Sequence, residues 1–339
     1  MSELNNALVS IVLPVYNGEM YVSLSIESCL KQTHTNIELI IVNDCSTDAT
    51  LLILNQYAQK DSRIKIINNA ENKKLPASLN IGHQEAKGDF ITWTSHDNFY
   101  ELNALEIMLN EIEEKKADIV YSNFSLIDNN GYKIREVELI GIENLIFGNF
   151  IGCSFLYKKD VFNRNNSYNE GLFLAEDYDF WLRAILHSRY AHINKALYYY
   201  RKHTESLTNQ IAINKERKEL WERSISTMYV NFGKEVLMTD SEEISNFLVK
   251  CLSNQKIDFD WIISIYSKIE NFKEILKRNQ NFLNEKLIDK VFLNKTIELM
   301  VLDQGLKSNL SKSLFILKKY LFVLDKTALK TLIKYSFFN

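Results

Sequence analysis

The chain has 339 residues, a length that favours one large domain followed by a smaller one. Hydrophobic residues make up 46% and charged residues 24% of the sequence, as in an ordinary globular protein, and the net charge of −3 argues against nucleic-acid binding through bulk charge. Neither a zinc site nor a disulfide framework is expected, and a reducing, cytoplasmic compartment fits best, because no CxxC pairing occurs among Cys29, Cys45, Cys153 and Cys251.

The hydropathy pattern predicts no targeting or membrane-spanning segment. The first residues lack the basic and apolar stretches of a signal peptide. No run of about 18 uncharged apolar residues follows, so we expect no spanning helix.

The first part of the chain alternates apolar runs with segments of helical periodicity. The expected strands read as buried on both faces and cover Val9–Val15, Ile37–Val42, Ile64–Ile67, Phe90–Thr94 and Ile119–Phe124. The expected helices between them cover Glu19–Lys31, Asp48–Lys60, Pro76–Lys87 and Leu102–Lys115. This order predicts an α/β fold with a doubly wound, mostly parallel central sheet, flanking helices and right-handed crossovers.

The pattern changes in the second half of the chain. A helix is expected over Asp177–Ser188, followed by one or two short strands over Ala191–Tyr200. From about residue 208 the sequence is rich in Leu, Ile, Lys, Glu and Asn with helical spacing. We therefore expect one domain over residues 1–225 and an all-helical C-terminal domain over residues 226–339.

Polar and aromatic residues follow the expected strands, at the carboxyl ends where open α/β sheets bind ligands. Tyr16 follows the first strand and can stack on a base, although an ordinary βα turn is the alternative. Asp44 follows the second strand and can accept a hydrogen bond from a pyrimidine, or cap a loop. Asp97 follows the fourth strand and can hold Mg²⁺ or Mn²⁺, because hard cations prefer oxygen ligands; a surface loop acid is the alternative.

Two later segments also carry charged side chains. Glu176 and Asp177 open an expected helix, where acids complement the helix dipole, or where Asp177 acts as a general base. Arg201 and His203 follow the last expected strand and can neutralise a diphosphate or complete a metal site, or be structural.

Taken together and in this order, these segments resemble glycosyltransferase family 2, the inverting enzymes of the GT-A fold. The matching stretches are VSIVLPVYNG, ELIIVNDCSTDAT, LPASLNIGHQEAKGDFITWTSHDN, LAEDYDFWLR and YYYRKHTESLT, within roughly residues 8–210. The resemblance implies transfer of a sugar from a nucleotide-diphosphate donor, most commonly UDP-linked, to an acceptor hydroxyl, with Mn²⁺ or Mg²⁺ as cofactor. The implied acceptor is a saccharide or lipid-linked oligosaccharide in bacterial capsule or O-antigen assembly.

The resemblance also implies roles for individual residues. Those implied to bind the nucleotide are Pro14, Val15, Tyr16, Asn17, Glu19, Asp44 and Asn80. Asp97 and His203 are implied to bind the metal, and Arg201 to lie with His203 near the diphosphate. Glu176 and Asp177 match the family's catalytic pair, whose second member is the base.

One departure from the family leaves an alternative open. Where many relatives have Asp-x-Asp-Asp, this chain has Ser95-His96-Asp97-Asn98, and Leu79 stands where many carry an arginine near the diphosphate. A catalytically degenerate, nucleotide-sugar-binding or scaffold protein is therefore the alternative function. A nucleotidyltransferase is disfavoured, because the loop Tyr16–Glu19 is acidic and lacks the basic, Gly-rich character that grips a triphosphate.

The C-terminal region carries lysines at helical spacing. Over 306–339 these are Lys307, Lys312, Lys318, Lys319, Lys326, Lys330 and Lys334, against the single acid Asp325. Such a basic amphipathic segment can lie on the inner face of an anionic membrane, or it can be a packed terminal helix with a solvated face. The helical segment Ile211–Phe232 is expected to pack on the first domain or to form a homodimer contact.

Overall fold

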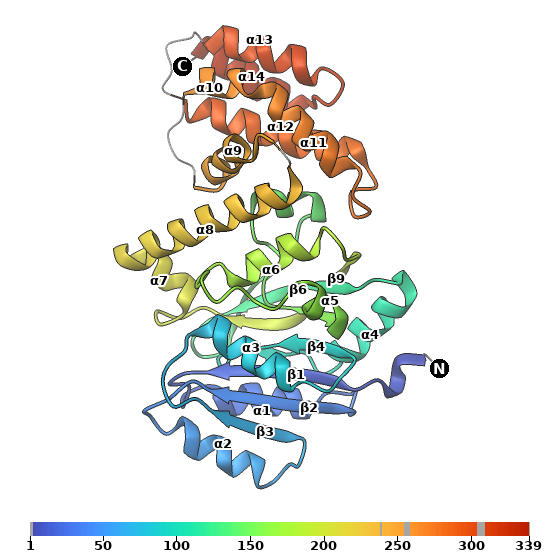
Figure 1. The fold of residues 1–339 in the computed structure, drawn as a ribbon, viewed down its shortest axis with the longest axis vertical. Helices are drawn as coiled ribbons and strands as arrows, with labels where there is room; N and C mark the ends of the chain where they lie inside the picture. The colour runs from blue at the N-terminus through green and yellow to red at the C-terminus, as the bar shows by residue number, and fades with distance from the viewer. Residues whose placement is uncertain (1–2, 238, 254–257, 304–308, 339) are drawn as a thin grey trace. The chain divides into compact units, whose positions relative to one another are not determined.

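The computed structural model describes residues 3–237, 239–253, 258–303 and 309–338 (Figure 1). The chain forms two compact units, the first made of 1–140 and 149–224, the second of 141–148 and 225–339. Helix α8 (Lys215–Val236) carries the chain from the first unit into the second. Among the described residues, no helix combines the length and apolar character needed to cross a membrane.

The first unit is built on a mixed sheet, which has nine strands within the described residues, in the order β3-β2-β1-β4-β8-β6-β9-β5, with β7 paired to β6. Their bounds are β1 (Val9–Val15), β2 (Ile37–Asn43), β3 (Ile64–Asn68), β4 (Phe90–Trp93), β5 (Phe99–Tyr100), β6 (Ile119–Ile127), β7 (Lys133–Val137), β8 (Phe155–Lys158) and β9 (Tyr190–Arg201). Strands β3, β2, β1 and β4 pair in parallel, as expected. Strand β8 runs antiparallel to both β4 and β6, and β9 runs parallel to β6.

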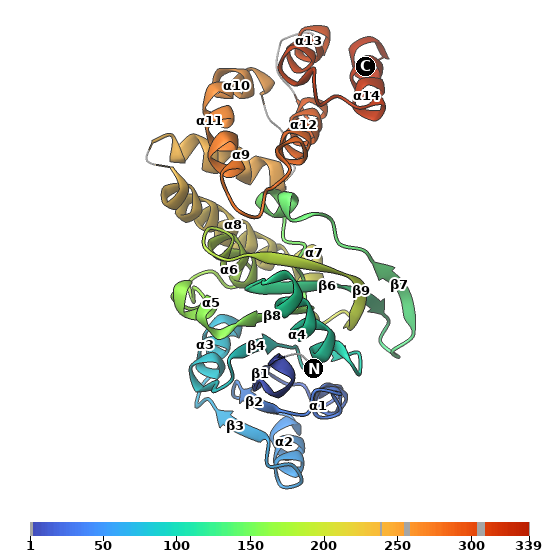
Figure 2. The ribbon, with the colours of Figure 1, turned by 90° about the vertical axis from the view of Figure 1, so that its right-hand side faces the viewer.

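Helices cover both faces of this sheet, which confirms the predicted α/β class. The described helices of the first unit are η1 (Glu3–Asn6), α1 (Val22–Leu30), α2 (Thr50–Ala58), α3 (Leu75–Glu85), α4 (Ala104–Lys115), α5 (Lys159–Arg164), α6 (Glu176–Ala184) and α7 (Leu207–Ile213). Figure 2 shows α3 and α5 on one face of the sheet and α1, α2 and α4 on the other. The buried runs of β1 and β2 explain this double cover, because a strand buried on both faces needs helices on each side.

The second unit is all helical apart from its connections, as the composition predicts. Its described elements are η2 (Ile142–Phe147), the C-terminal part of α8, α9 (Ser241–Ser253), α10 (Phe259–Ser264), α11 (Tyr266–Lys277), α12 (Glu285–Val301), α13 (Asn309–Tyr320) and α14 (Lys326–Phe338). Phe147 of η2 packs against Phe247 and Phe292, and the Tyr229 hydroxyl donates to the Ile146 carbonyl at 2.9 Å. These contacts explain why the apolar segment 141–148 belongs with the helices.

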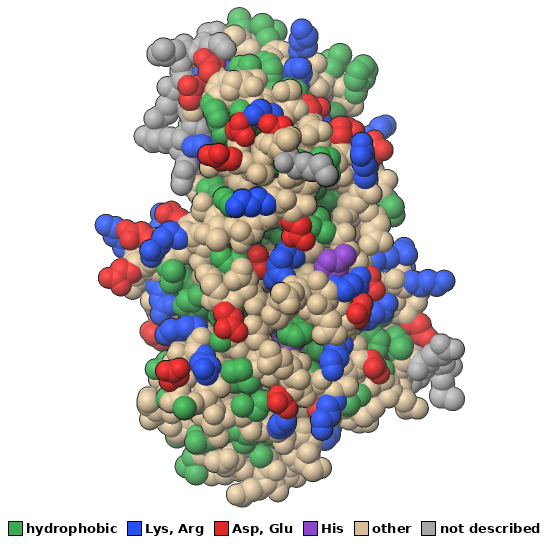
Figure 3. Space-filling model, viewed as in Figure 1, with side chains coloured by type: hydrophobic (Ala, Val, Ile, Leu, Met, Phe, Trp, Pro, Cys, Tyr) green, Lys and Arg blue, Asp and Glu red, His purple; other side chains and the backbone are tan. Residues whose placement is uncertain are grey.

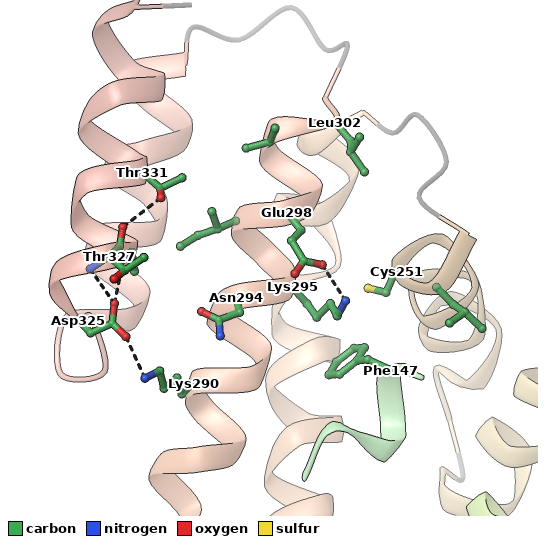
Figure 4. Close-up of a pocket in the computed structure, with 14 residues that line it drawn as sticks. Phe147, Cys251, Lys290, Asn294, Lys295, Glu298, Leu302, Asp325, Thr327 and Thr331 are labelled. Atoms are coloured by element: carbon green, nitrogen blue, oxygen red, sulfur yellow. Dashed lines mark hydrogen bonds and ion pairs between the residues drawn. The ribbon is translucent and has the colours of Figure 1, made fainter. Parts of the chain in front are cut away.

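A groove of about 970 Å³ runs along η2, α9, α12 and α14 in the second unit (Figure 4). Lys290 pairs with Asp325 at 2.9 Å, and Lys295 pairs with Glu298 at 2.7 Å. Because each lysine of the groove is matched by a carboxylate, its walls carry little net charge to attract an anion.

Candidate active site

The topology of the sheet explains which loops meet. Strands β4, β6 and β9 all run in one direction, and β8 runs in the other between β4 and β6. The residues after β4 and β9 therefore lie at the same edge as the residues before β8. This edge receives Asp97 after β4, Asn149 and Cys153 before β8, and His203 after β9.

The loops after β1 and β2 hold each other in place. The Asn17 side-chain oxygen accepts from the Thr47 amide at 2.9 Å, and the Glu19 carboxylate accepts from the Ala49 amide at 2.8 Å. Asp48, expected at a helix start, accepts from the Thr50 amide at 3.0 Å. Asn17 and Glu19 thus shape this loop pair through their own hydrogen bonds.

The loop after β1 also packs closely against the residues that follow β4. A Cβ atom placed on Gly18 would lie 2.8 Å from the His96 ring, so only glycine fits there. Pro14 and Val15 end the buried strand β1, whereas the Tyr16 side chain is 47% exposed. Tyr16 is therefore the residue of this loop with an aromatic face available to a base.

Asp44 is buried, and the protein occupies its carboxylate. It accepts hydrogen bonds from the Asn69 side chain and the Lys73 amide, both at 2.8 Å, and from the Lys74 amide at 2.9 Å. These bonds fix the loop that leads into α3, where Lys74 adopts a left-handed φ of 72°. The arrangement corresponds to the loop-capping alternative, in which Oδ1 accepts two of these bonds and Oδ2 accepts one.

Asn80 lies on α3 and is also engaged by the protein. Its side-chain nitrogen donates to the Tyr168 carbonyl at 3.0 Å and to Glu170 at 2.9 Å, while its oxygen accepts from the Tyr168 amide at 2.9 Å. Ser167 and Leu174, at the two ends of the loop that contains Tyr168 and Glu170, both have a left-handed φ. Asn80 therefore holds the strained segment that leads into α6.

Asp97 and His203 form the metal-side pair. One Asp97 oxygen lies 2.7 Å from His203 Nε2, whereas Asp97 Oδ1 is buried and has no hydrogen-bond partner among the described residues. Burial raises the pKa of Asp97, but the His203 hydrogen bond and the neighbouring imidazoles outweigh it and hold the pKa below its usual value. An ionised oxygen without a partner is a position that a cation can fill.

The number of protein ligands at this position is small. No group of three or more His, Cys, Asp or Glu side chains among the described residues could hold a metal ion. Asp97 and His203 fit the oxygen and nitrogen preferences of Mn²⁺ and Mg²⁺ only if the ion's remaining ligands come from elsewhere, such as phosphate oxygens.

Arg201 stabilises the backbone of the loop that carries Asp97. Its buried guanidinium donates to the backbone carbonyls of Asp97 at 3.0 Å, Asp128 at 3.0 Å and Asn129 at 2.9 Å, and lies 4.4 Å from the centre of the Tyr21 ring. The structure thus uses Arg201 to fix the backbone under Asp97. Tyr21, which also contacts the His203 ring at 5.6 Å, is a supporting residue that the sequence analysis missed.

Asp177 and Glu176 open α6 as expected, and they differ in environment. Asp177 accepts from the Tyr178 amide at 2.7 Å and from the Asn149 side chain at 2.9 Å. Burial raises the pKa of Asp177, and the hydrogen bond from Asn149 partly offsets this. Glu176 is buried with Oε2 unpartnered among the described residues, so burial and the charge of Asp177 raise its pKa to about 8.

The raised pKa of about 8 keeps a proton on Glu176 at neutral pH. Glu176 stays protonated because two adjacent carboxylates in a buried site cannot both ionise easily. The Asn149 contact was not predictable from sequence, because an isolated asparagine between two loop residues carries no motif.

Cys153 links the two acidic positions. Burial raises the pKa of its thiol, and the charges of both Asp97 and Asp177 raise it further. Both carboxylates are therefore close enough to Cys153 to act on it electrostatically. The metal-side pair and the Asp177 carboxylate share one neighbourhood, an arrangement that can bind a charged leaving group and accept a proton.

Comparisons with known proteins give the family of the chain. The family described as "Glycosyl transferase family 2" matches residues 10–188. An uncharacterized glycosyltransferase of Rickettsia typhi is 32% identical over 228 residues, covering 63% of this chain and 70% of the relative. One from Rickettsia felis is 34% identical over 230 residues, but the chain covers only 37% of that relative.

A third relative and a solved structure extend the comparison. Glycosyltransferase GlyG of Streptococcus pneumoniae is 32% identical over 221 residues, covering 59% of this chain and 72% of the relative. The crystal structure of S. aureus TarS 1–349 in complex with UDP-GlcNAc has a TM-score of 0.56 at 20% identity, covering 96% of this chain and 91% of that one. At that identity the structural likeness shows a shared, GT-A-like fold. The family match covers more than half of the chain and shows that the chain belongs to glycosyltransferase family 2.

Proposed function

We propose that the protein moves a sugar from a UDP-sugar to a hydroxyl of a saccharide or lipid-linked oligosaccharide, with inversion at the anomeric carbon. The observation that carries the proposal is the placement of Asp177, held by Asn149, beside the Asp97–His203 pair at one edge of the sheet. Support for the donor comes from the TarS structures, which were solved in complex with UDP and with UDP-GlcNAc.

In this proposal the nucleotide lies across the carboxyl ends of β1 and β2. The exposed ring of Tyr16 stacks on the base, and Pro14, Val15, Asn17 and Glu19 shape the loop that carries it. Asp44 and Asn80 contribute indirectly by fixing the loops beside the donor. Arg201 keeps its positive charge buried behind Asp97, where it favours the negative diphosphate through space.

Asp97 and His203 would hold Mn²⁺ or Mg²⁺, together with phosphate oxygens of the donor. When bound, the ion neutralises the charge that develops on the leaving diphosphate. The buried, unpartnered Oδ1 of Asp97 is the feature that fits such an ion. His203 Nε2 lies 2.7 Å from the other Asp97 oxygen, so this nitrogen would have to give up its hydrogen bond to Asp97 in order to bind the ion.

The proposed base is Asp177, which accepts the proton of the attacking hydroxyl. The amide of Tyr178 and the side chain of Asn149 hold the carboxylate in one orientation, and Glu176 stays protonated beside it. A positioned general base contributes about 10²–10⁴ in rate. Attack in line with the departing diphosphate inverts the anomeric configuration.

The proposed setting is the assembly of a bacterial surface polysaccharide such as a capsule or O-antigen, by a cytoplasmic enzyme. This part of the proposal is supported by the family resemblance alone. A homodimer contact through Ile211–Phe232 also stays a prediction. Within that segment Ile225, Met228, Tyr229 and Phe232 are buried inside one chain, and Ile213 is exposed.

A catalytically degenerate binding protein is the second candidate. The segment Ser95-His96-Asp97-Asn98 contains Asp97 as its single acid, and this reduced number of acids favours the second candidate. Release of UDP from a panel of UDP-sugars with Mn²⁺ separates the candidates, using wild type, Asp177→Asn and the matched control Asp160→Asn. Asp160 is an exposed acid of α5, and its surface pair with Arg164 contributes little.

We expect Asp177→Asn to lose about 10²–10⁴ in turnover while it keeps donor binding, as measured by thermal shift. Asp160→Asn should match the wild type. UDP binding with no release of UDP by the wild type from any sugar would favour the degenerate protein. Wild-type turnover in Asp177→Asn would remove Asp177 as the base.

A further inference from the structure

Helix α13 buries one face and exposes a second, apolar one. The buried face carries Ser313, Ile316 and Tyr320. The exposed leucines are Leu310 and Leu314 on the helix and Leu321 directly after its end, with the partly buried Leu317 between them. The spacing of four and three residues places Leu310, Leu314 and Leu317 on one stripe of the helix. Phe322 directly follows Leu321 and is 97% exposed.

Helix α14 also exposes apolar side chains, and it adds exposed lysines. It packs on α13, where the Ser313 hydroxyl donates to the Leu332 carbonyl at 3.4 Å, and its Ala328 and Leu332 are buried. Leu329 and Ile333 are exposed one turn apart. Beside them lies a row of exposed lysines four residues apart, Lys326, Lys330 and Lys334.

Negative charge is almost absent from this part of the chain. The single acid of residues 309–338 is Asp325, which pairs with Lys290 of α12 at 2.9 Å (Figure 4). Lys312, also on α13, is buried in an ion pair with Asp303. The exposed lysines therefore give α13 and α14 a net positive surface. Figure 3 shows hydrophobic and basic side chains next to one another over α13.

We propose that these exposed residues of α13 and α14, which we call the basic leucine surface, dock the protein onto an anionic lipid membrane. The apolar side chains enter the headgroup region, and the lysines face the lipid phosphates. An exposed apolar stripe next to a lysine row matches a partner that is apolar inside and negative at its surface. The inference does not depend on which sugar the protein transfers or on the role of Asp177.

A second copy of the chain is the competing partner. The leucine spacing also suits a coiled-coil seam. However, the stripe is flanked by Lys318, and α14 adds the lysine row, so two copies would bring like charges together without acids to pair them. Charge complementarity therefore favours the anionic membrane.

Flotation of the full chain with lipid vesicles tests the proposal. We compare vesicles of phosphatidylcholine mixed with phosphatidylglycerol against vesicles of phosphatidylcholine alone. One variant combines Leu314→Ser, Leu321→Ser and Phe322→Ser, and a second combines Lys326→Glu, Lys330→Glu and Lys334→Glu. The control is Leu52→Ser on α2, because Leu52 and Leu321 are each 62% exposed.

We expect wild type and Leu52→Ser to float with the anionic vesicles only, and to dissociate as salt is added. Loss of the charge of each lysine should weaken binding about fivefold, equivalent to about 1 kcal/mol. Because each glutamate also adds a negative charge, the triple lysine variant should lose more than about a hundredfold. The triple apolar variant should also bind the anionic vesicles more than about tenfold more weakly, because its three apolar side chains no longer enter the membrane. Both should keep the wild-type circular dichroism and thermal midpoint.

Two outcomes would overturn the proposal. The first is equal flotation of the wild type and both triple variants. The second is a wild-type dimer in light scattering that the triple apolar variant converts to a monomer while vesicle binding stays absent, which would assign the surface to a second copy.

Discussion

Replacing Glu176 with glutamine isolates the effect of its buried carboxyl group on stability. The pKa of Glu176 is raised from 4.5 to about 8, because burial and the charge of Asp177 disfavour its ionised form. For a group whose folded-state pKa is raised, the stability it contributes is complete below the unfolded-state pKa. That stability is lost as the pH rises toward the folded-state pKa. The wild type should therefore lose stability between pH 4.5 and about 8.

The size of the effect follows from the two pKa values. Each pH unit above 4.5 removes about 1.4 kcal/mol, up to the folded-state pKa of about 8. Glutamine resembles the protonated acid and does not ionise. We expect Glu176→Gln to exceed the wild type by less than about 1 kcal/mol at pH 5, by about 3 kcal/mol at pH 7 and by about 5 kcal/mol above pH 8.

Urea unfolding of both proteins across this pH range measures the difference. Tryptophan fluorescence reports on unfolding of both units, because Trp93 and Trp181 are buried in the first and Trp261 lies in the second. Glu138→Gln is the control, since it makes the same chemical change at an exposed position of the same unit. A gap between Glu176→Gln and the wild type that stays constant from about pH 5 to about pH 8 would refute the reasoning.

Two further substitutions test the neighbouring groups. Asn149→Ala removes the hydrogen bond that lowers the pKa of Asp177, so the acidic limb of the kcat–pH profile should move to higher pH, with Asn130→Ala as an exposed control. An unmoved limb would count against Asn149 as a positioning residue. Asp97→Asn keeps the volume of the side chain but removes its charge, so Mn²⁺ should no longer raise the thermal midpoint of the UDP complex. An equal effect of Mn²⁺ on the wild type and on Asp97→Asn would exclude Asp97 as a ligand.

The parallel half of the sheet could be predicted from sequence because its strands are continuous apolar runs. The expected strand Val9–Val15 coincides with β1, and β2 and β3 extend the expected ranges by a single residue each. Such strands are buried on both faces, so their pattern is local and strong. The expected helix from Glu19 begins later, at Val22, because the loop after β1 is held by α2.

The antiparallel part of the sheet could not be predicted in the same way. Strand β8 has only 4 residues and β5 only 2, so neither shows a usable periodicity. Strand β7 is almost wholly exposed, and it forms because β6 lies beside it. These strands depend on tertiary pairing more than on their own sequences.

The candidate site shows the same division. The residue types at Asp97, Glu176, Asp177 and His203 could be chosen from sequence, because each follows a strand or opens a helix. The side chains that contact these residues could not be predicted, since Asn149 and Tyr21 act through contacts that form only in the folded chain. The sequence likewise could not reveal that the buried Arg201 donates to backbone carbonyls.

A crystal structure with UDP and an acceptor saccharide bound would test the role of Asp177 most directly. The account predicts that an Asp177 carboxylate oxygen lies within about 2.6–3.2 Å of the attacking hydroxyl, with the diphosphate on the Asp97 side. An acceptor hydroxyl held by another side chain, with Asp177 turned away from it, would contradict the account.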